Sequence, residues 1–169
     1  LAQIKTEVVW NNGTPSLLID GQYHPPFAYM SYLGEEDYYK EIAATGIHLY
    51  NFPAYLGEGG INTTSVIGAF RNAIWKGESQ YDFSSIETDF KKILNADPKA
   101  KVVIRLYLDP PRGWNLDTPS AAAQLPDGSL FRQCFASNEW REKTKVVLEE
   151  CLDWLLKSKY RNHLAGIHV

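Results

Sequence analysis

Residues 101–114, KVVIRLYLDPPRGW, constrain the fold more than any other stretch of the chain. They begin as a short run with apolar side chains on both faces, which is typical of a strand buried on two sides in a parallel sheet. The run must end at Pro110 and Pro111, because proline has no N–H to donate to a neighbouring strand. A buried strand whose carboxyl end carries polar and aromatic residues predicts an α/β protein with a ligand site at that end.

Three other apolar stretches predict strands of the same kind, and one of them also ends at a proline. The four predicted strands are residues 27–33, 47–53, 101–108 and 164–169. Before the first of them, residues 8–21 contain an Asn-Gly and an Asp-Gly sequence. These turn sequences predict a β-hairpin at the start of the chain.

The segments between the strands carry apolar residues at three-four spacing, which predicts helices. The expected helices cover about residues 35–45, 84–96 and 139–158. Ser84, with Glu87 three residues later, fits a capping box, and Asn138 is the expected N-cap of the longest helix. Gly46 suits the left-handed conformation that ends a helix.

Strands that alternate with helices predict a parallel sheet with right-handed crossovers. Four such units are half of a (β/α)8 barrel of the TIM type, and a flavodoxin-like open sheet is the alternative. The barrel is favoured because the long loops follow strands and because the chain ends on a strand with no helix to cover it. We therefore expect an N-terminal hairpin in residues 1–26 and a partial barrel in residues 27–169, truncated after strand four.

Two long connections, residues 54–77 and 110–137, follow predicted strands. Long connections in compact domains are usually functional or mobile. We expect the first to form an elaborated loop over the site, with a helical part at about residues 64–72.

Aromatic residues make up 13% of the chain, with ten Tyr and five Trp, which is more than a core alone requires. Such side chains also line carbohydrate sites, because their faces cover CH-rich surface while their edges form hydrogen bonds. The net charge of −3, without a basic cluster, argues against nucleic-acid binding. No stretch has the length of a membrane span.

The two cysteines, Cys134 and Cys151, are too few for a disulfide framework, and neither has a Cys or His partner at metal-ligand spacing. Cys151 falls on the apolar face of a helix and is expected in the core. No nucleotide-binding, serine-hydrolase or zinc-protease motif is present, so we expect no cofactor and no metal. The start at Leu1, without methionine, favours an exported protein, either secreted or periplasmic.

Five short segments, in their order and spacing, carry a family resemblance. They are GIHLYN at 46–51, YDFS at 81–84, PRGW at 111–114, the group of Cys134, Asn138, Trp140 and Arg141, and YRNH at 160–163. From about residue 27 to 169 the chain resembles the N-terminal half of a clan-A (β/α)8 glycoside hydrolase, closest to the family 42 β-galactosidase type. Where that family usually has an arginine at the end of strand two, this chain has Asn51.

The resemblance implies a retaining hydrolase of β-galactosides or related glycans, in which two glutamates act as acid/base and nucleophile. In that clan the first follows strand four and the second lies at strand seven, so both are expected beyond Val169. Residues 1–169 would then contribute sugar-binding strand ends and no catalytic residue, and we expect them to be inactive alone. Some relatives bind zinc through a cysteine near Cys134, but the companion cysteines are absent here.

Eight residues near the predicted strand ends are candidates for substrate binding. They are Tyr29, Tyr50, Asn51, Arg105, Tyr107, Asp109, Trp114 and His168. Strand alternation predicts that Arg105, Tyr107 and Asp109 share one face, which is the most informative polar pattern in the chain.

Most of these candidates have an ordinary structural alternative. Arg105 either orients a carboxylate inside the barrel or pairs with a helix acid outside it, with equal weight. Trp114 is a sugar-stacking platform or a loop anchor. Asn51 bonds a sugar hydroxyl or caps a turn, Asp109 more often forms a turn than acts in catalysis, and His168 is more often a core histidine.

The favoured function is therefore a glycoside hydrolase segment that lines part of a sugar-binding cleft. Its expected partners are a carbohydrate substrate and either the remainder of a longer chain or a second copy. The alternative is a non-catalytic carbohydrate-binding or assembly domain of half-barrel form. A half barrel exposes sheet edges that must be paired or covered, so this alternative predicts a dimer.

Overall fold

The computed structural model of the chain describes residues 4–25, 27–58 and 71–169. The fold is mixed α/β and divides into two compact units. The first unit contains Leu1–Pro53, Ile86–Arg105 and Leu155–Val169, and the second contains Ala54–Ser85 and Leu106–Trp154. Each unit is therefore assembled from segments that are distant in the sequence.

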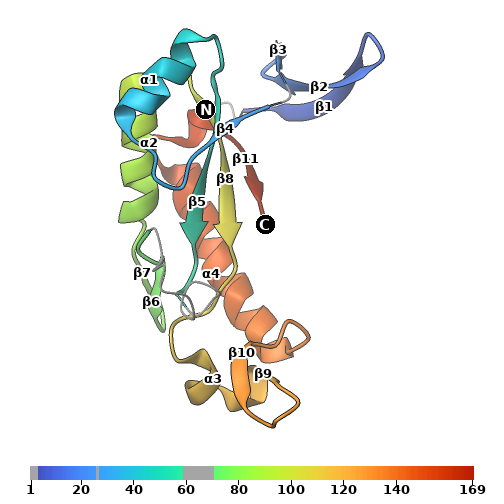
Figure 1. The fold of residues 1–169 in the computed structure, drawn as a ribbon, viewed down its shortest axis with the longest axis vertical. Helices are drawn as coiled ribbons and strands as arrows, with labels where there is room; N and C mark the ends of the chain where they lie inside the picture. The colour runs from blue at the N-terminus through green and yellow to red at the C-terminus, as the bar shows by residue number, and fades with distance from the viewer. Residues whose placement is uncertain (1–3, 26, 59–70) are drawn as a thin grey trace. The chain divides into compact units, whose positions relative to one another are not determined.

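The first unit begins with a three-stranded antiparallel sheet (Figure 1). Its strands, in spatial order, are β1 (Thr6–Asn11), β2 (Thr14–Ile19) and β3 (Gln22–His24). The predicted hairpin is confirmed as β1 and β2, and β3 extends it by a third strand. Both turns use the positive φ angles that Asn-Gly and Asp-Gly sequences favour, at Asn12 and Gly13 and at Asp20 and Gly21.

A four-stranded sheet holds the predicted parallel strands (Figure 1). They are β4 (Tyr29–Met30), β5 (Leu49–Tyr55), β8 (Lys101–Tyr107) and β11 (Leu164–His168). The spatial order β11-β8-β5-β4 follows the chain without a reversal, and the β4–β5 and β8–β11 pairs are parallel. A flavodoxin-like sheet reverses its order at the first strand, so that alternative does not fit.

The bounds of β4 and β5 depart most from the prediction. Residues 27–33 were expected to form a strand, but β4 has only two residues. Conversely, β5 does not stop at Pro53 but runs to Tyr55. The pairing of β5 with β4 ends at Asn51, so the missing N–H of Pro53 interrupts no hydrogen bond of that pair.

The three predicted helices are present as α1 (Glu36–Ala44), α2 (Ser84–Ala96) and α4 (Asn138–Lys157). Their caps differ from the prediction. The side chain that accepts a first-turn N–H of α2 is Asp82, which bonds the Ser84 N–H at 2.9 Å. In α4, the Ser137 hydroxyl accepts from the Trp140 N–H at 3.3 Å. Both caps thus lie one or two residues before the positions predicted.

Helices α1 and α2 cover one face of the parallel sheet (Figure 1). On β5, Tyr50 packs edge-to-face on Tyr39 of α1 with ring centres 5.6 Å apart, and Phe52 packs likewise on Phe90 of α2 at 5.4 Å. Along β8, buried and half-buried residues alternate, and Ile104 is 0% exposed. The half-buried residues of β8 therefore point to the face that these helices leave open.

The second unit contains most of the two long connections, which are more structured than predicted. They include β6 (Trp75–Gly77), β7 (Gln80–Tyr81), the short helix α3 (Trp114–Asp117), β9 (Ala122–Gln124) and β10 (Leu130–Gln133). β6 pairs with β7, and β9 pairs with β10, each as an antiparallel hairpin. Residues 59–70, with most of the helical part expected at 64–72, lie outside the described residues.

Both cysteines are free thiols. Cys151 is buried in α4 as predicted, and burial raises the pKa of its thiol to about 12. None of the helices in the described part of the chain is long and apolar enough to cross a membrane.

A buried carboxylate, Asp97, joins the end of α2 to the start of β5. It is 3% exposed, and its oxygens accept from the Tyr50 hydroxyl at 3.0 Å and the Lys99 N–H at 3.0 Å. The His48 Nδ1 lies 2.7 Å from the same carboxylate. Buried polar groups are stable only when they are paired in this way.

Replacing Asp97 by alanine is expected to lower the free energy of unfolding by about 3 kcal/mol, because the buried hydroxyl of Tyr50 and the half-buried ring of His48 lose their shared acceptor. Denaturant unfolding followed by circular dichroism measures the change. Asp37→Ala is the matched control, since Asp37 is exposed and pairs with Lys40 on the surface of α1. We expect it to cost no more than about 0.5 kcal/mol. Equal stability of the two variants would contradict the role given to Asp97.

Candidate functional site

The eight candidate residues are divided between the two units. Tyr29, Tyr50, Asn51, Arg105 and His168 belong to the first unit, and Tyr107, Asp109 and Trp114 belong to the second. The two groups are therefore described in turn.

Two candidates of the first unit serve its core. Tyr50 is 0% exposed, and its hydroxyl donates to Asp97. Burial, followed by the hydrogen bond to Asp97, raises the pKa of Tyr50. Tyr29 packs edge-on against Tyr39 with ring centres 5.9 Å apart. Packing accounts for both tyrosines, and we leave them out of the proposed sugar site.

Arg105 lies on the face of β8 that α1 and α2 do not cover, because its neighbour Ile104 faces the helices. Its Nη1 donates to the Tyr32 hydroxyl at 3.3 Å and approaches the Met30 sulfur at 3.9 Å. Since β5 lies between β8 and β4, the guanidinium reaches across the open face of β5. The guanidinium of Arg105 therefore lies on the face of the sheet that α1 and α2 leave open.

Asn51 is in register with Met30 and lies on the same open face, since its neighbours Tyr50 and Phe52 face the helices. Its Oδ1 is buried and has no hydrogen-bond partner among the described residues. An unsatisfied buried oxygen costs about 1–3 kcal/mol, so such groups usually have a water or a ligand as partner. Asn51 is therefore the strongest candidate of the first unit for a ligand contact.

His168 is exposed, so it does not fit the core-histidine alternative for this candidate. It belongs to β11 and is in register with Arg105 of the neighbouring strand β8. The edge position of β11 in the sheet explains its exposure.

In the second unit, the carboxyl ends of β5 and β8 are held together. The ring of Tyr107 stacks on that of Tyr55, with centres 4.9 Å apart and planes at 12°. The Leu56 N–H donates to the Tyr107 carbonyl at 2.9 Å. Just beyond, a Cβ on Gly57 would lie 2.1 Å from the backbone of Pro110. The absence of a side chain at Gly57 therefore allows the loops after the two strands to approach each other.

Asp109 follows the end of β8, and its direction is set by a side-chain contact rather than by strand alternation. The Gln133 Nε2 donates to Asp109 Oδ1 at 3.2 Å. Gln133, the last residue of β10, is 3% exposed, and its Oε1 has no partner among the described residues. No feature of the sequence singles out Gln133, because one glutamine within a long predicted loop is not distinctive.

Trp114 fits the loop-anchor alternative. It is 5% exposed, and its Nε1 donates to the Ala121 carbonyl at 3.1 Å. The ring of Trp75 approaches it at 6.0 Å, and the ammonium of Lys143 lies 5.3 Å from its centre. With Ala121 and Trp140 it forms a small core of the second unit.

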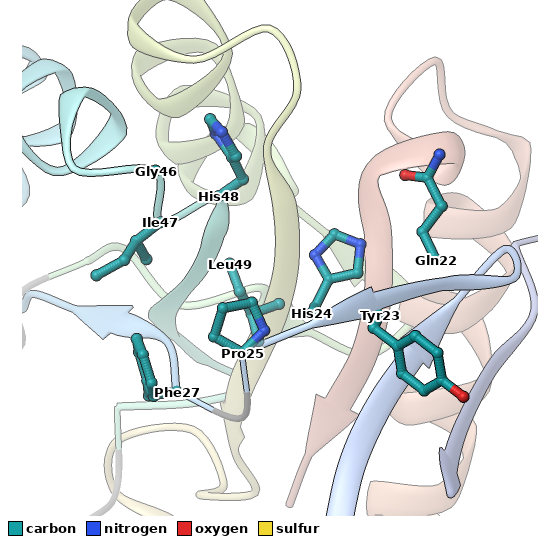
Figure 2. A pocket seen from close by; sticks show the side chains of 9 residues that line it. All are labelled: Gln22, Tyr23, His24, Pro25, Phe27, Gly46, Ile47, His48 and Leu49. Atoms are coloured by element: carbon teal, nitrogen blue, oxygen red, sulfur yellow. The ribbon is translucent and has the colours of Figure 1, made fainter. Parts of the chain in front are cut away.

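A pocket of about 230 Å³ in the first unit is lined by residues 22–25, 27 and 46–49. Figure 2 shows the imidazole of His48 directed away from that of His24, in accord with its contact to Asp97. The pocket lies at the amino end of β5, whereas α/β proteins of the barrel type bind ligands at the carboxyl ends. It therefore differs from the predicted site.

No cluster of three or more His, Cys, Asp or Glu side chains suited to a metal ion occurs in residues 4–25, 27–58 and 71–169. The candidate contacts are thus amide, guanidinium, carboxylate and aromatic groups. These groups suit a neutral hydroxylated ligand, because hydroxyls both donate and accept hydrogen bonds.

Replacing Gly57 by alanine is expected to lower the free energy of unfolding by about 2 kcal/mol, because the new Cβ overlaps the Pro110 backbone. Gly166→Ala is the matched control, since a Cβ there meets its nearest atom at 4.0 Å, an ordinary contact. Thermal unfolding of both variants measures the difference. If Gly57→Ala unfolds at the same temperature as the control, the two loops do not meet at this point.

His24, in β3 of the hairpin sheet, makes a pH-dependent contribution to the free energy of unfolding. Burial, then the charges of Lys101 and His48, lower the pKa of His24 from its ordinary value of 6.5. The unfolded chain therefore binds this proton more readily, so His24 reduces stability as the pH falls through that value. Between about pH 7 and 5, we expect stability to fall less steeply in His24→Asn than in the parent chain. Denaturant titrations at several pH values measure the free energy of unfolding of both proteins. An equal dependence of that free energy on pH in the two proteins would contradict this assignment.

Comparison with known proteins supports the fold. No family model and no curated protein sequence matches the chain. Among solved structures, a polyextremophilic β-galactosidase from Halorubrum lacusprofundi is similar with a TM-score of 0.52 and 18% identity. A β-galactosidase from the psychrophilic Marinomonas ef1 gives the same TM-score with 16% identity. Each alignment covers 83% of this chain but only 20% of the other protein. The chain therefore has a glycoside hydrolase-like fold and spans about a fifth of the length of these two structures.

Proposed function

We propose that the chain forms part of the sugar-binding cleft of a retaining glycoside hydrolase of the β-galactosidase type. In this proposal its parallel strands are an arc of a (β/α)8 barrel, with the hairpin sheet as an N-terminal addition. The observation that carries the proposal is the buried, unpartnered Oδ1 of Asn51 on the open face of β5. Arg105 supplies a guanidinium on the same face.

These two side chains suit a sugar because of their complementary hydrogen-bonding capacity. The amide oxygen of Asn51 accepts from one hydroxyl, and the guanidinium of Arg105 donates to another. Both lie on the sheet face opposite the helices, which is the inside face in a β/α barrel. The bond from Arg105 to Tyr32 limits the orientations of the guanidinium before a ligand arrives.

Asp109 in the second unit has a binding role in this proposal. Its carboxylate is fixed by the amide of Gln133, so it accepts from a sugar hydroxyl in a defined direction. Retaining hydrolysis needs two carboxyl groups about 5–5.5 Å apart. We assign both to residues outside this sequence, in keeping with the 20% of each β-galactosidase that the chain matches.

A non-catalytic carbohydrate-binding or assembly domain is the alternative. Both functions require sugar binding through the open face, so hydrolysis in the longer protein distinguishes them. Sedimentation provides a second criterion, because an assembly domain built from a half barrel must pair its exposed sheet edges.

The present chain is expected to bind methyl β-galactoside without hydrolysing a nitrophenyl β-galactoside. Asn51→Ala and Arg105→Ala should each weaken binding about tenfold in a calorimetric titration, because each removes a hydrogen-bonding group from a buried contact. Arg132→Ala is the control, since that guanidinium lies over the ring of Phe131 in the second unit. Clear turnover would overturn the assignment of the catalytic carboxyls, and unchanged binding in both variants would overturn the sugar site.

A further inference from the structure

The second unit contains a pocket of about 630 Å³ that none of the preceding assignments uses. Its walls come from the β6–β7 hairpin, the segment around α3 and the middle of α4. Its volume lies within the range of about 300–1,000 Å³ that is usual for small-molecule sites. Three segments distant in sequence therefore converge on a ligand-sized space.

Aromatic side chains form one part of this wall. Trp75, Tyr81 and Trp114 all line the pocket; the first two are partly exposed and Trp114 is buried. The Trp75 N–H donates to the Leu56 carbonyl at 2.6 Å, which fixes the hairpin to the end of β5. The ring of Trp75 also rests edge-on against Trp114. The aromatic surface is thus rigidly held, which lowers the entropic cost of binding a ligand on it.

The polar part of the wall carries charges of both signs. Lys76 and Glu78 line the pocket from the β6–β7 hairpin and are exposed, and Asp117 lines it from α3. Arg112 pairs with Glu58 at 3.6 Å, and Lys143 pairs with Glu139 at 2.9 Å. Because the two paired cations are already compensated, the pocket does not favour an anion. Donors and acceptors beside an aromatic surface instead match a neutral, hydroxyl-rich ring.

We infer that this pocket binds a neutral saccharide ring at a second sugar site, formed by residues other than Asn51 and Arg105. The inference rests on the carbohydrate specificity of the proposed function. The CH-rich face of the ring packs on Trp75 and Tyr81, and its hydroxyls bond Lys76 and Glu78. A glycan chain is the ligand class that presents several such rings, so an oligosaccharide is the natural probe for this pocket.

The test is a titration of the full 169-residue chain with β-1,4-linked galactotriose, followed by tryptophan fluorescence and by amide chemical shifts. The Lys76→Ala/Glu78→Ala double variant removes two exposed side chains and should fold normally. The control is Lys5→Ala/Glu7→Ala, which removes a similar Lys–Glu pair, 3.3 Å apart, from the hairpin sheet. We expect about tenfold weaker binding in the first variant and less than a twofold change in the control.

Further variants separate this inference from the proposed function. Weaker binding in Lys76→Ala/Glu78→Ala, with no effect of Arg105→Ala, supports the pocket and contradicts the strand-end site. The reverse pattern overturns the pocket and leaves the proposed function standing. Absence of binding, or a preference for tri-galacturonate over galactotriose, also overturns the inference, since the pocket would then take no sugar or an anionic one.

Discussion

The burial of one face of the parallel strands against α1 and α2 determines where every other side chain of these strands points. Tyr50 and Phe52 pack against aromatic rings of the two helices, and Ile104 of β8 is fully buried. Because side chains alternate along a strand, this packing leaves Asn51 and Arg105 on the opposite face. A shift of one residue would reverse the arrangement, so that β5 would bury the amide of Asn51 and β8 the guanidinium of Arg105 under the helices.

The second unit is organised by different contacts. Its hairpins and short helix have few residues each, so their own backbone hydrogen bonds contribute little stability. The unit is stabilised instead by the packing of its small core, which consists of Trp114, Ala121 and Trp140. Here the carboxylate of Asp109 is oriented by the side chain of Gln133 rather than by strand alternation.

The strands and helices of the first unit could be predicted from the sequence, because apolar periodicity reports which face of an element is buried. The shared face of Arg105 and Tyr107 followed from the same periodicity. Which candidates belong to the core and which can contact a ligand could not be predicted from the sequence. Tyr50 resembles a ligand residue in the sequence, and only the positions of Tyr39 and Asp97 reveal it as a core residue. Gln133 could not be found because its importance depends on a contact with a residue 24 positions away.

The close approach of Gly57 to the Pro110 backbone also bears on how such a chain can diverge. The loops after β5 and β8 share one contact surface in the second unit, so a change in either alters the space available to the other. Insertions in these two loops, or any side chain at position 57, would have to arise together with a compensating change in the partner loop. In related sequences we expect the two loops to vary in length as a pair.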